Sequence, residues 1–216
     1  MLNPSTAYVP TDPINIVTAP QDQYDAYTNA TANSVRRQPE DIEAIVLHHT
    51  HTGSTDLPVG TYISGGIRAG VGAPFFIARD GTIHQVGDWR NRAIQHVSSS
   101  DRRVVQDAPR TISGARVNNA GSIGIEIDVG WNYNDGSRYG SPIEGPEGRP
   151  TEEQIVAVRR LTNYLIQQIN EARGDTAITT ENAVFAHPEL QRDKQPVEAT
   201  LATEEVRSRQ GFARRR

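Results

Sequence analysis

Three of the six histidines in this chain lie within four positions, at the end of the apolar run IVLHHTHTG (residues 45–53). A fourth, His187, ends the short apolar stretch AVFAH. Neutral imidazole is the commonest zinc ligand in proteins, and a catalytic zinc site combines three protein ligands with one open position. Open α/β sheets build their sites at strand ends, so histidines at two strand ends could supply two zinc ligands.

A carboxylate that could complete such a site lies on the alternating segment GSIGIEIDVG (121–130). Its apolar residues share one face, which leaves Glu126 and Asp128 on the other. A carboxylate on the face of a core strand is unfavourable unless it is paired, hydrated or close to a metal, so we expect a polar cleft there. His48, His187 and one carboxylate would make a three-ligand zinc set. Alternatively, the histidines are hydrogen-bonded core residues and Glu126 is a structural ion-pair partner.

Strands and helices that could position these groups alternate along the chain. Strands are predicted at 42–49 (IEAIVLHH), at 74–87 (PFFIARDGTIHQVG, a hairpin turning at Asp80 and Gly81), at 121–130 and at 183–187. The clearest helix follows Pro150, where Thr151 and Gln154 form a capping box and Gly174 ends the apolar stripe. This pattern predicts an α/β fold, a single domain whose mixed, mostly buried central β-sheet is flanked by helices.

The composition divides the chain into two parts. Residues 1–40 are polar, contain several prolines and lack sustained periodicity, so we expect an extended N-terminal arm. Residues 41–216 are expected to form the domain. Within it, the glycine-bearing loops 97–120 and 130–150 are long, and long loops in compact domains tend to form functional rims.

Several classes of function are disfavoured by composition. The chain has no cysteine, which excludes disulfides, thiolate ligands and cysteine nucleophiles. Its net charge of −4 gives no general attraction to nucleic acid or anionic membranes, and the basic end RQGFARRR is interpreted as a solvated terminus. No stretch is long enough to span a membrane, and the first residues lack the pattern of a secretory signal. We therefore expect a monomer, synthesised in the cytoplasm, with no nucleic-acid or membrane partner.

Four motifs carry a resemblance to a known family. IEAIVLHHT, PFFIARDGTIHQV, NNAGSIGIEI and FAHPELQRDK occur in this order and spacing, from about residue 42 to 200. In these motifs the chain resembles the zinc-dependent N-acetylmuramoyl-L-alanine amidases, a superfamily that includes phage lysozyme amidases and animal peptidoglycan recognition proteins. The resemblance implies a Zn²⁺ cofactor, a peptidoglycan or muropeptide substrate, and hydrolysis of the amide between N-acetylmuramic acid and L-alanine. It also implies an endolysin-like protein that acts on the cell wall once it is delivered or released.

The resemblance assigns roles to individual residues. His48 and His187 match the family's first two zinc ligands. Glu126 matches its catalytic glutamate, which acts as general base. His96 matches a histidine that lines the substrate cleft, and Lys194 lies near the position of a lysine that stabilises the developing oxyanion.

The third zinc ligand departs from the family pattern. Pro196 occupies the place, two residues after the lysine, where the family has cysteine or aspartate. Glu198 can supply an oxygen ligand, and we expect it to be the third ligand. Asp193 is the rival, and a site with no third protein ligand is the remaining alternative. A second departure is the Ala73-Pro74 pair, which replaces the tyrosine or histidine usual before the hairpin.

The remaining aromatic and histidine residues receive secondary roles. His49 points to the face opposite His48, so we expect it to be packed and hydrogen-bonded, with His51 on the cleft rim. Trp131 and Tyr133 are expected to bind substrate from the wall of the cleft.

The alternative to an enzyme is a peptidoglycan-binding module that has lost the metal. The retention of Glu126 favours the enzyme, because a binding module has no use for a general base, whereas Pro196 favours the module.

Overall fold

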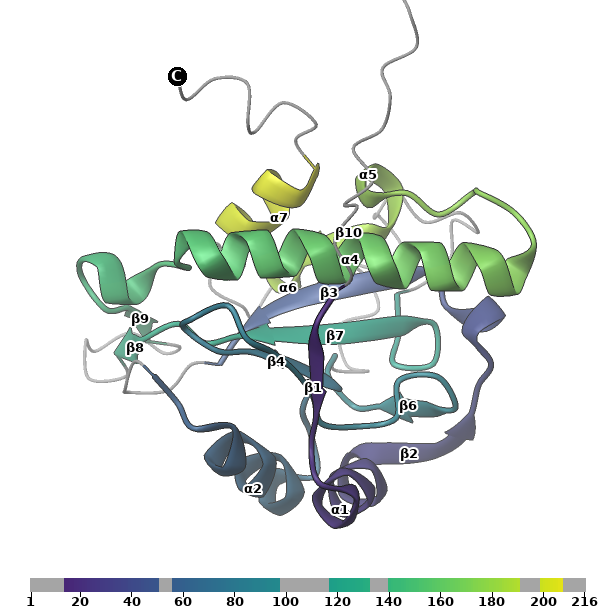
Figure 1. Cartoon of the computed structure of the whole chain (residues 1–216), viewed down its shortest axis with the longest axis horizontal. Helices are drawn as coiled ribbons and strands as arrows, with labels where there is room; N and C mark the ends of the chain where they lie inside the picture. Colours follow the sequence, from purple (N-terminus) through teal and green to yellow (C-terminus); the bar gives the residue numbers. More distant parts are fainter. Residues whose placement is uncertain (1–13, 51–55, 98–116, 133–139, 191–198, 208–216) are drawn as a thin grey trace, which may run out of the picture.

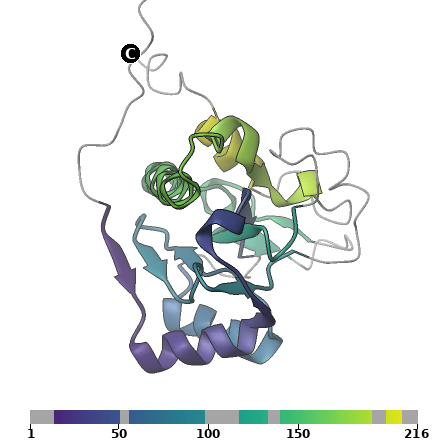
Figure 2. The same cartoon turned by 90° about the vertical axis from the view of Figure 1, so that its right-hand side faces the viewer.

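The computed structural model describes residues 14–50, 56–97, 117–132, 140–190 and 199–207. A central sheet has the long helix α4 along one face and helices α1 and α2 along the other (Figures 1 and 2). The elements of these ranges are β1 (Ile16–Thr18), α1 (Gln21–Thr31), β2 (Ala32–Arg36), η1 (Pro39–Asp41), β3 (Ala44–His49), α2 (Val59–Ala69), β4 (Phe75–Ile77), β5 (Ile83–Gln85), β6 (Arg92–Ile94), β7 (Ser122–Ile127), β8 (Trp131–Asn132), β9 (Ser141–Pro142), η2 (Pro146–Gly148), α4 (Glu152–Arg173), α5 (Thr180–Ala183), β10 (Val184–Ala186), α6 (His187–Leu190) and α7 (Thr200–Arg207).

The main sheet has six strands in the order β1-β5-β4-β7-β3-β10. Neighbouring strands run parallel except β4 and β5, which form the predicted antiparallel hairpin. Gly81 gives its turn the required positive φ, at +82°. The prediction of a mixed central sheet flanked by helices in one domain is therefore confirmed.

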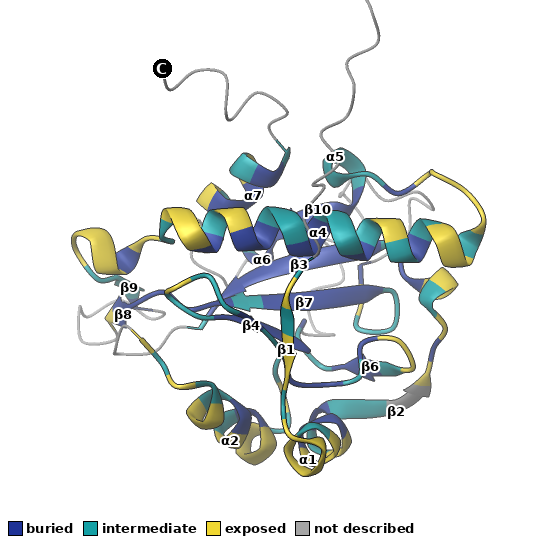
Figure 3. Ribbon diagram, viewed as in Figure 1, coloured by how far each residue is buried: buried dark blue, intermediate teal, exposed yellow. Residues whose placement is uncertain are grey.

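The two faces of the central strands have different environments. β3 is buried throughout and β7 is buried except at Glu126 (Figure 3). One face packs on α4, in a core that includes Ile45, Leu47, Ile123, Ile125 and Ile127 from the strands and Val158, Leu161, Leu165 and Ile169 from the helix. Because strand residues alternate between faces, His48, Gly124 and Glu126 point away from α4.

Helix α4 begins and ends as the sequence predicted. Gln154 donates its backbone N–H to Thr151 Oγ1 at 3.0 Å, and Thr151 donates its own N–H to Gln154 Oε1 at 2.9 Å. Gly174 ends the helix in the left-handed conformation. No helix within the described ranges is long and apolar enough to cross a membrane.

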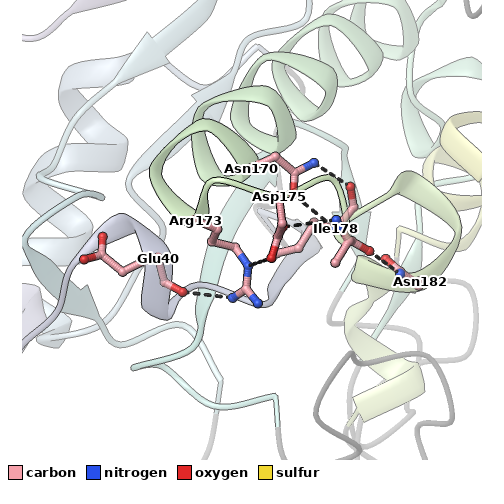
Figure 4. Close-up of polar contacts among 7 residues, drawn as sticks. Glu40, Asn170, Arg173, Asp175, Ile178 and Asn182 are labelled. Carbon is pink, nitrogen blue, oxygen red and sulfur yellow. Dashed lines mark hydrogen bonds and ion pairs between the residues drawn. The ribbon is translucent and has the colours of Figure 1, made fainter.

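The C-terminal end of α4 is tied to two other segments (Figure 4). Asn170 exchanges two hydrogen bonds with the backbone of Ile178, at 2.8 and 3.1 Å, which fixes the approach to α5. Arg173 donates to the backbone oxygen of Glu40 at 2.9 Å and pairs with Asp175 at 3.4 Å. The contact between Arg173 and Glu40 joins the helix to η1, which precedes β3.

The described part of the predicted N-terminal arm is not extended. Residues 14–40 form β1, α1, β2 and η1 instead, and β1 pairs in parallel with β5 at the edge of the main sheet. Helix α1 could not be predicted from the sequence, because only three of its eleven residues, Tyr27, Thr28 and Thr31, are buried. An apolar stripe is therefore absent, and tertiary contacts position the helix.

Tyr27 fastens α1 to α2 and to the segment after it. The side chain is fully buried between two glycines. A Cβ at Gly66, in α2, would lie 2.4 Å from Tyr27 Cε2, and one at Gly72 would lie 2.0 Å from the hydroxyl oxygen. Both separations are too short for atoms in contact, so this packing depends on glycine at each position.

We predict opposite effects for two adjacent glycines of α2. At Gly65 an added Cβ would meet no atom within 4 Å, so Gly65→Ala should stabilise the fold by roughly 0.5–1 kcal/mol through helix propensity. Gly66→Ala should destabilise it by about 1–3 kcal/mol, because the new methyl overlaps the Tyr27 ring. Urea unfolding of both variants measures the difference, and equal stabilisation by both would contradict the packing described for Tyr27.

Candidate metal centre

Two histidines and one glutamate come together at the ends of three adjacent strands. His48 pairs with Glu126 in the register of β3 and β7. Ala186 of β10 pairs with Leu47, so the next residue, His187, comes level with His48. Both histidines are nearly fully buried, with 3% and 4% of their surface exposed.

His48 and His187 face each other through equivalent ring nitrogens. Their Nδ1 atoms are 2.9 Å apart. Two nitrogens bound to one tetrahedral zinc at ~2.0–2.1 Å would be about 3.3 Å apart, so a small movement of either ring would fit the ion between them. Imidazole nitrogens that converge in this way fit two of the three ligands of a catalytic zinc.

The described residues place no third protein ligand beside these two histidines. Within the described ranges, no group of three or more His, Cys, Asp or Glu side chains is placed to hold a metal ion. Several predicted site residues lie outside those ranges, namely His51, Tyr133, Asp193, Lys194 and Glu198.

Glu126 lies beside a pair of tyrosines that the sequence did not single out. Tyr27 donates to Tyr62 at 3.0 Å, and Ala73 donates its backbone N–H to Tyr62 at 2.8 Å. Burial, followed by electrostatic interaction with Tyr27 and with the negative charge of Glu126, raises the pKa of Tyr62 well above its usual value, so its hydroxyl stays protonated. The Tyr62 ring also stacks on Phe76, which pairs with Glu126 across the sheet.

The position of Tyr62 relates to a departure noted in the sequence. Ala73 stands where the resemblance expects a tyrosine or histidine, and the hydroxyl of Tyr62, from α2, contacts the backbone of this residue. No sequence signal marked this contact, because α2 contains three glycines and its apolar pattern is short.

His96 lies behind His48, on the side away from His187. Its Nδ1 is 3.1 Å from His48 Nε2, and its Nε2 is 3.0 Å from Ser122 Oγ. The ring lies over Gly124, where a Cβ would approach His96 Cγ to 2.8 Å. Burial, followed by the positive charge of Arg37, lowers the pKa of His96 to about 3, so the ring is neutral at pH 7.

A turn between His96 and β7 holds this histidine in place. Asn119 Oδ1 accepts the backbone N–H groups of His96 and Val97, both at 2.9 Å. Asn119 Nδ2 donates to the backbone oxygen of Val97 at 2.9 Å. Ser122, at the start of β7, donates its hydroxyl to the backbone oxygen of Asn118 at 2.6 Å.

Arg37, which no sequence pattern marked, holds the same turn by hydrogen bonds to its backbone. Only 3% of its surface is exposed. The guanidinium donates to the backbone oxygens of Trp89, Asn119, Ala120 and Ser122. Burial lowers the pKa of Arg37 to about 10, which leaves it charged at pH 7. Its side chain therefore replaces water as the partner of these backbone carbonyl groups.

The prediction for His49 is confirmed. Its Nε2 accepts a hydrogen bond from the backbone N–H of Ala199 at 3.2 Å, and the side chain is 6% exposed. Ala199 has a φ of +56°, unusual for a residue with a Cβ. The ring centre of Trp131 lies 6.3 Å from that of His49. Trp131 is fully buried here, and its contact with substrate stays a prediction.

Asp128, the second carboxylate on the polar side of the sequence pattern, has a structural role. It is fully buried, and burial raises its pKa. Its two oxygens accept hydrogen bonds from the Leu57 N–H at 2.8 Å and the Thr50 hydroxyl at 3.3 Å. Asp128 thus joins the residues on either side of the segment 51–55, and Glu126 is the carboxylate available for chemistry.

His187 is supported from the C-terminal helix. Glu189 accepts the backbone N–H of Ala186 at 2.7 Å. Arg207 of α7 donates to both Glu189 oxygens, at 2.9 and 2.8 Å, and also to the backbone oxygen of Val184. This bidentate ion pair fixes the turn that follows β10, where His187 lies.

Comparison with known protein families gives a match over most of the chain. The family described as N-acetylmuramoyl-L-alanine amidase is matched by residues 37–198. No curated protein sequence matches the chain.

Several solved structures have a similar fold, among them the following three. The N-acetylmuramoyl-L-alanine amidase LysC from Clostridium intestinale URNW is 20% identical, with a TM-score of 0.50, covering 85% of this chain and 89% of its own. The catalytic domain of XlyA is 15% identical, with a TM-score of 0.53 and coverages of 89% and 99%. The Ph2119 endolysin from the Thermus scotoductus MAT2119 bacteriophage is 15% identical, with a TM-score of 0.50 and coverages of 90% and 100%.

Proposed function

The chain belongs to the N-acetylmuramoyl-L-alanine amidase family, and on this premise we propose that it uses zinc to hydrolyse the amide between N-acetylmuramic acid and L-alanine in peptidoglycan. The observation that carries the proposal is the facing pair of Nδ1 atoms of His48 and His187, level with Glu126 on the next strand. Peptidoglycan, or a muropeptide released from it, is the proposed substrate, which the protein would reach after delivery or release to the cell wall.

The proposed metal ligands are His48, His187 and Glu198. Burial keeps the two imidazoles away from competing water, and their converging nitrogens match the preference of zinc for nitrogen donors. When bound, zinc supplies a Lewis acid that polarises the amide carbonyl and makes a water molecule more acidic.

Glu126 is the proposed general base. It lies on the same side of the sheet as His48, which it opposes in the register of β3 and β7, and it is the residue of β7 that is not fully buried. The carboxylate would take a proton from the attacking water and then deliver it to the departing nitrogen of L-alanine. Lys194 is proposed to stabilise the negative charge that develops on the carbonyl oxygen. Substrate contacts are proposed for His96, Trp131 and Tyr133.

The first test is the metal content of single variants. We expect one zinc per chain in the wild type, and we expect His48→Ala and His187→Ala to lose zinc and amidase activity together. His49→Ala is the matched control, because its ring faces the other side of β3 and bonds to Ala199. It should retain zinc, although its stability should fall. A wild-type chain that binds peptidoglycan without zinc or hydrolysis would support a binding module instead.

The second test concerns the general base. Glu126→Gln keeps the size of the side chain but removes its basicity, so zinc binding should be unchanged. Turnover of a muropeptide should fall by on the order of 10²- to 10⁴-fold, the usual contribution of a positioned proton-transfer group. Near-wild-type turnover by this variant would rule out the role.

The third test ranks the two candidates for the remaining ligand. Glu198→Ala should weaken zinc affinity by about tenfold or more, because removing a zinc ligand leaves two protein donors. Asp193→Ala should leave the affinity almost unchanged. Chelator competition with each variant measures the ranking, and the reverse order would assign the ligand to Asp193.

A further inference from the structure

His48 has a hydrogen-bonding partner at each ring nitrogen. Nδ1 faces His187, whereas Nε2 is 3.1 Å from His96 Nδ1. His96 Nε2 is in turn 3.0 Å from Ser122 Oγ, and Ser122 Oγ is 2.6 Å from the backbone oxygen of Asn118. A continuous row of polar atoms therefore runs from a backbone carbonyl to the proposed metal position.

The first proton in this row can be placed from chemistry. A serine hydroxyl has one hydrogen, and a backbone carbonyl oxygen can only accept. Two oxygens 2.6 Å apart require a hydrogen between them. Ser122 therefore donates to Asn118 and presents a lone pair to His96. It follows that His96 Nε2 carries the proton of their hydrogen bond.

The remaining protons follow from the first. The hydrogen-bond partners of His96 are a hydroxyl, an imidazole and an amide oxygen, none of which has a negative charge to stabilise an imidazolium. A neutral imidazole has one N–H, so His96 Nδ1 accepts. His48 Nε2 must then donate, which leaves a lone pair on His48 Nδ1, directed towards His187.

Sterics hold the middle of the row independently of any metal. The His96 ring lies against Gly124, where a Cβ would approach both His96 Cγ and Ala73 Cβ to 2.8 Å. The Asn119 side chain binds the His96 backbone N–H at 2.9 Å. The acceptor for His48 Nε2 is thus placed by packing and backbone hydrogen bonds.

We propose that His96 and Ser122 are positioning residues, which hold His48 in the tautomer whose Nδ1 lone pair is available to zinc. The proposal rests on the proposed function, since it takes His48 as a zinc ligand. It assigns His96 an effect on the metal through His48, whereas the sequence predicted a contact with the substrate. Hydrogen bonds of this kind orient metal-binding histidines and raise the basicity of the ligand.

Zinc affinity of the full chain, measured by competition with a chelator, tests the proposal. His96→Ala removes the acceptor of His48 and should weaken zinc binding by about 10- to 100-fold. His96→Asn can place an amide oxygen near the former Nδ1 position, so it should recover most of that loss. His84→Gln is the matched control, because His84 lies on β5, outside the row, and its replacement should leave zinc affinity unchanged. Circular dichroism of each variant checks the fold.

The outcomes separate positioning from substrate contact. If His96→Ala binds zinc as tightly as the wild type and only its KM for a muropeptide rises, the proposal is wrong. A wild type that binds no zinc would instead contradict the proposed function.

Nitrogen NMR of the metal-free protein provides a readout that needs neither zinc nor turnover. It should show the proton of His48 on Nε2 in the wild type and a mixture of tautomers in Ser122→Ala. A wild-type His48 protonated on Nδ1 would overturn the proposal.

Discussion

The parallel register between β3 and β7 is the constraint on which the rest of the site depends. It sets His48 opposite Glu126, on neighbouring strands that lie about 4.8 Å apart. A shift of one residue would turn one of these side chains into the core beneath α4. The isoleucines of β7 and Leu47 of β3 oppose that one-residue shift, because it would turn apolar side chains away from α4. The apolar face of the sheet therefore holds the polar face in place.

Burying two histidines at a strand end requires supports for the backbone around them. Arg37 serves the turn before β7, and the Arg207–Glu189 pair serves the turn after β10. Both arginines donate to backbone carbonyls, and both come from parts of the chain remote from those carbonyls. These hydrogen bonds thereby limit the movement of the backbone near the two histidines.

Much of the fold was predictable because its signals are local. Alternation predicted β7 and the face of Glu126, the capping box and terminal glycine delimited α4, and a glycine turn marked the β4–β5 hairpin. Helices α1 and α2 were not predicted, for a physical reason. Helix α1 depends mainly on one large buried side chain, Tyr27. Helix α2 contains glycines, and one of them, Gly66, is needed because the Tyr27 ring packs directly against it. Neither feature produces a periodic apolar pattern.

The candidate site likewise has a part that the sequence predicted and a part that only the tertiary structure determined. Residue types, strand ends and the family resemblance singled out His48, His187 and Glu126 as candidate site residues from the sequence, and the structure brings the two histidines together. The tertiary structure decided which nitrogens face each other, that His96 bonds to His48, that Asp128 is a structural residue, and that Tyr62 lies at the backbone of Ala73. These contacts join residues up to 139 positions apart. Such pairings depend on strand order and packing, which a local sequence pattern cannot encode.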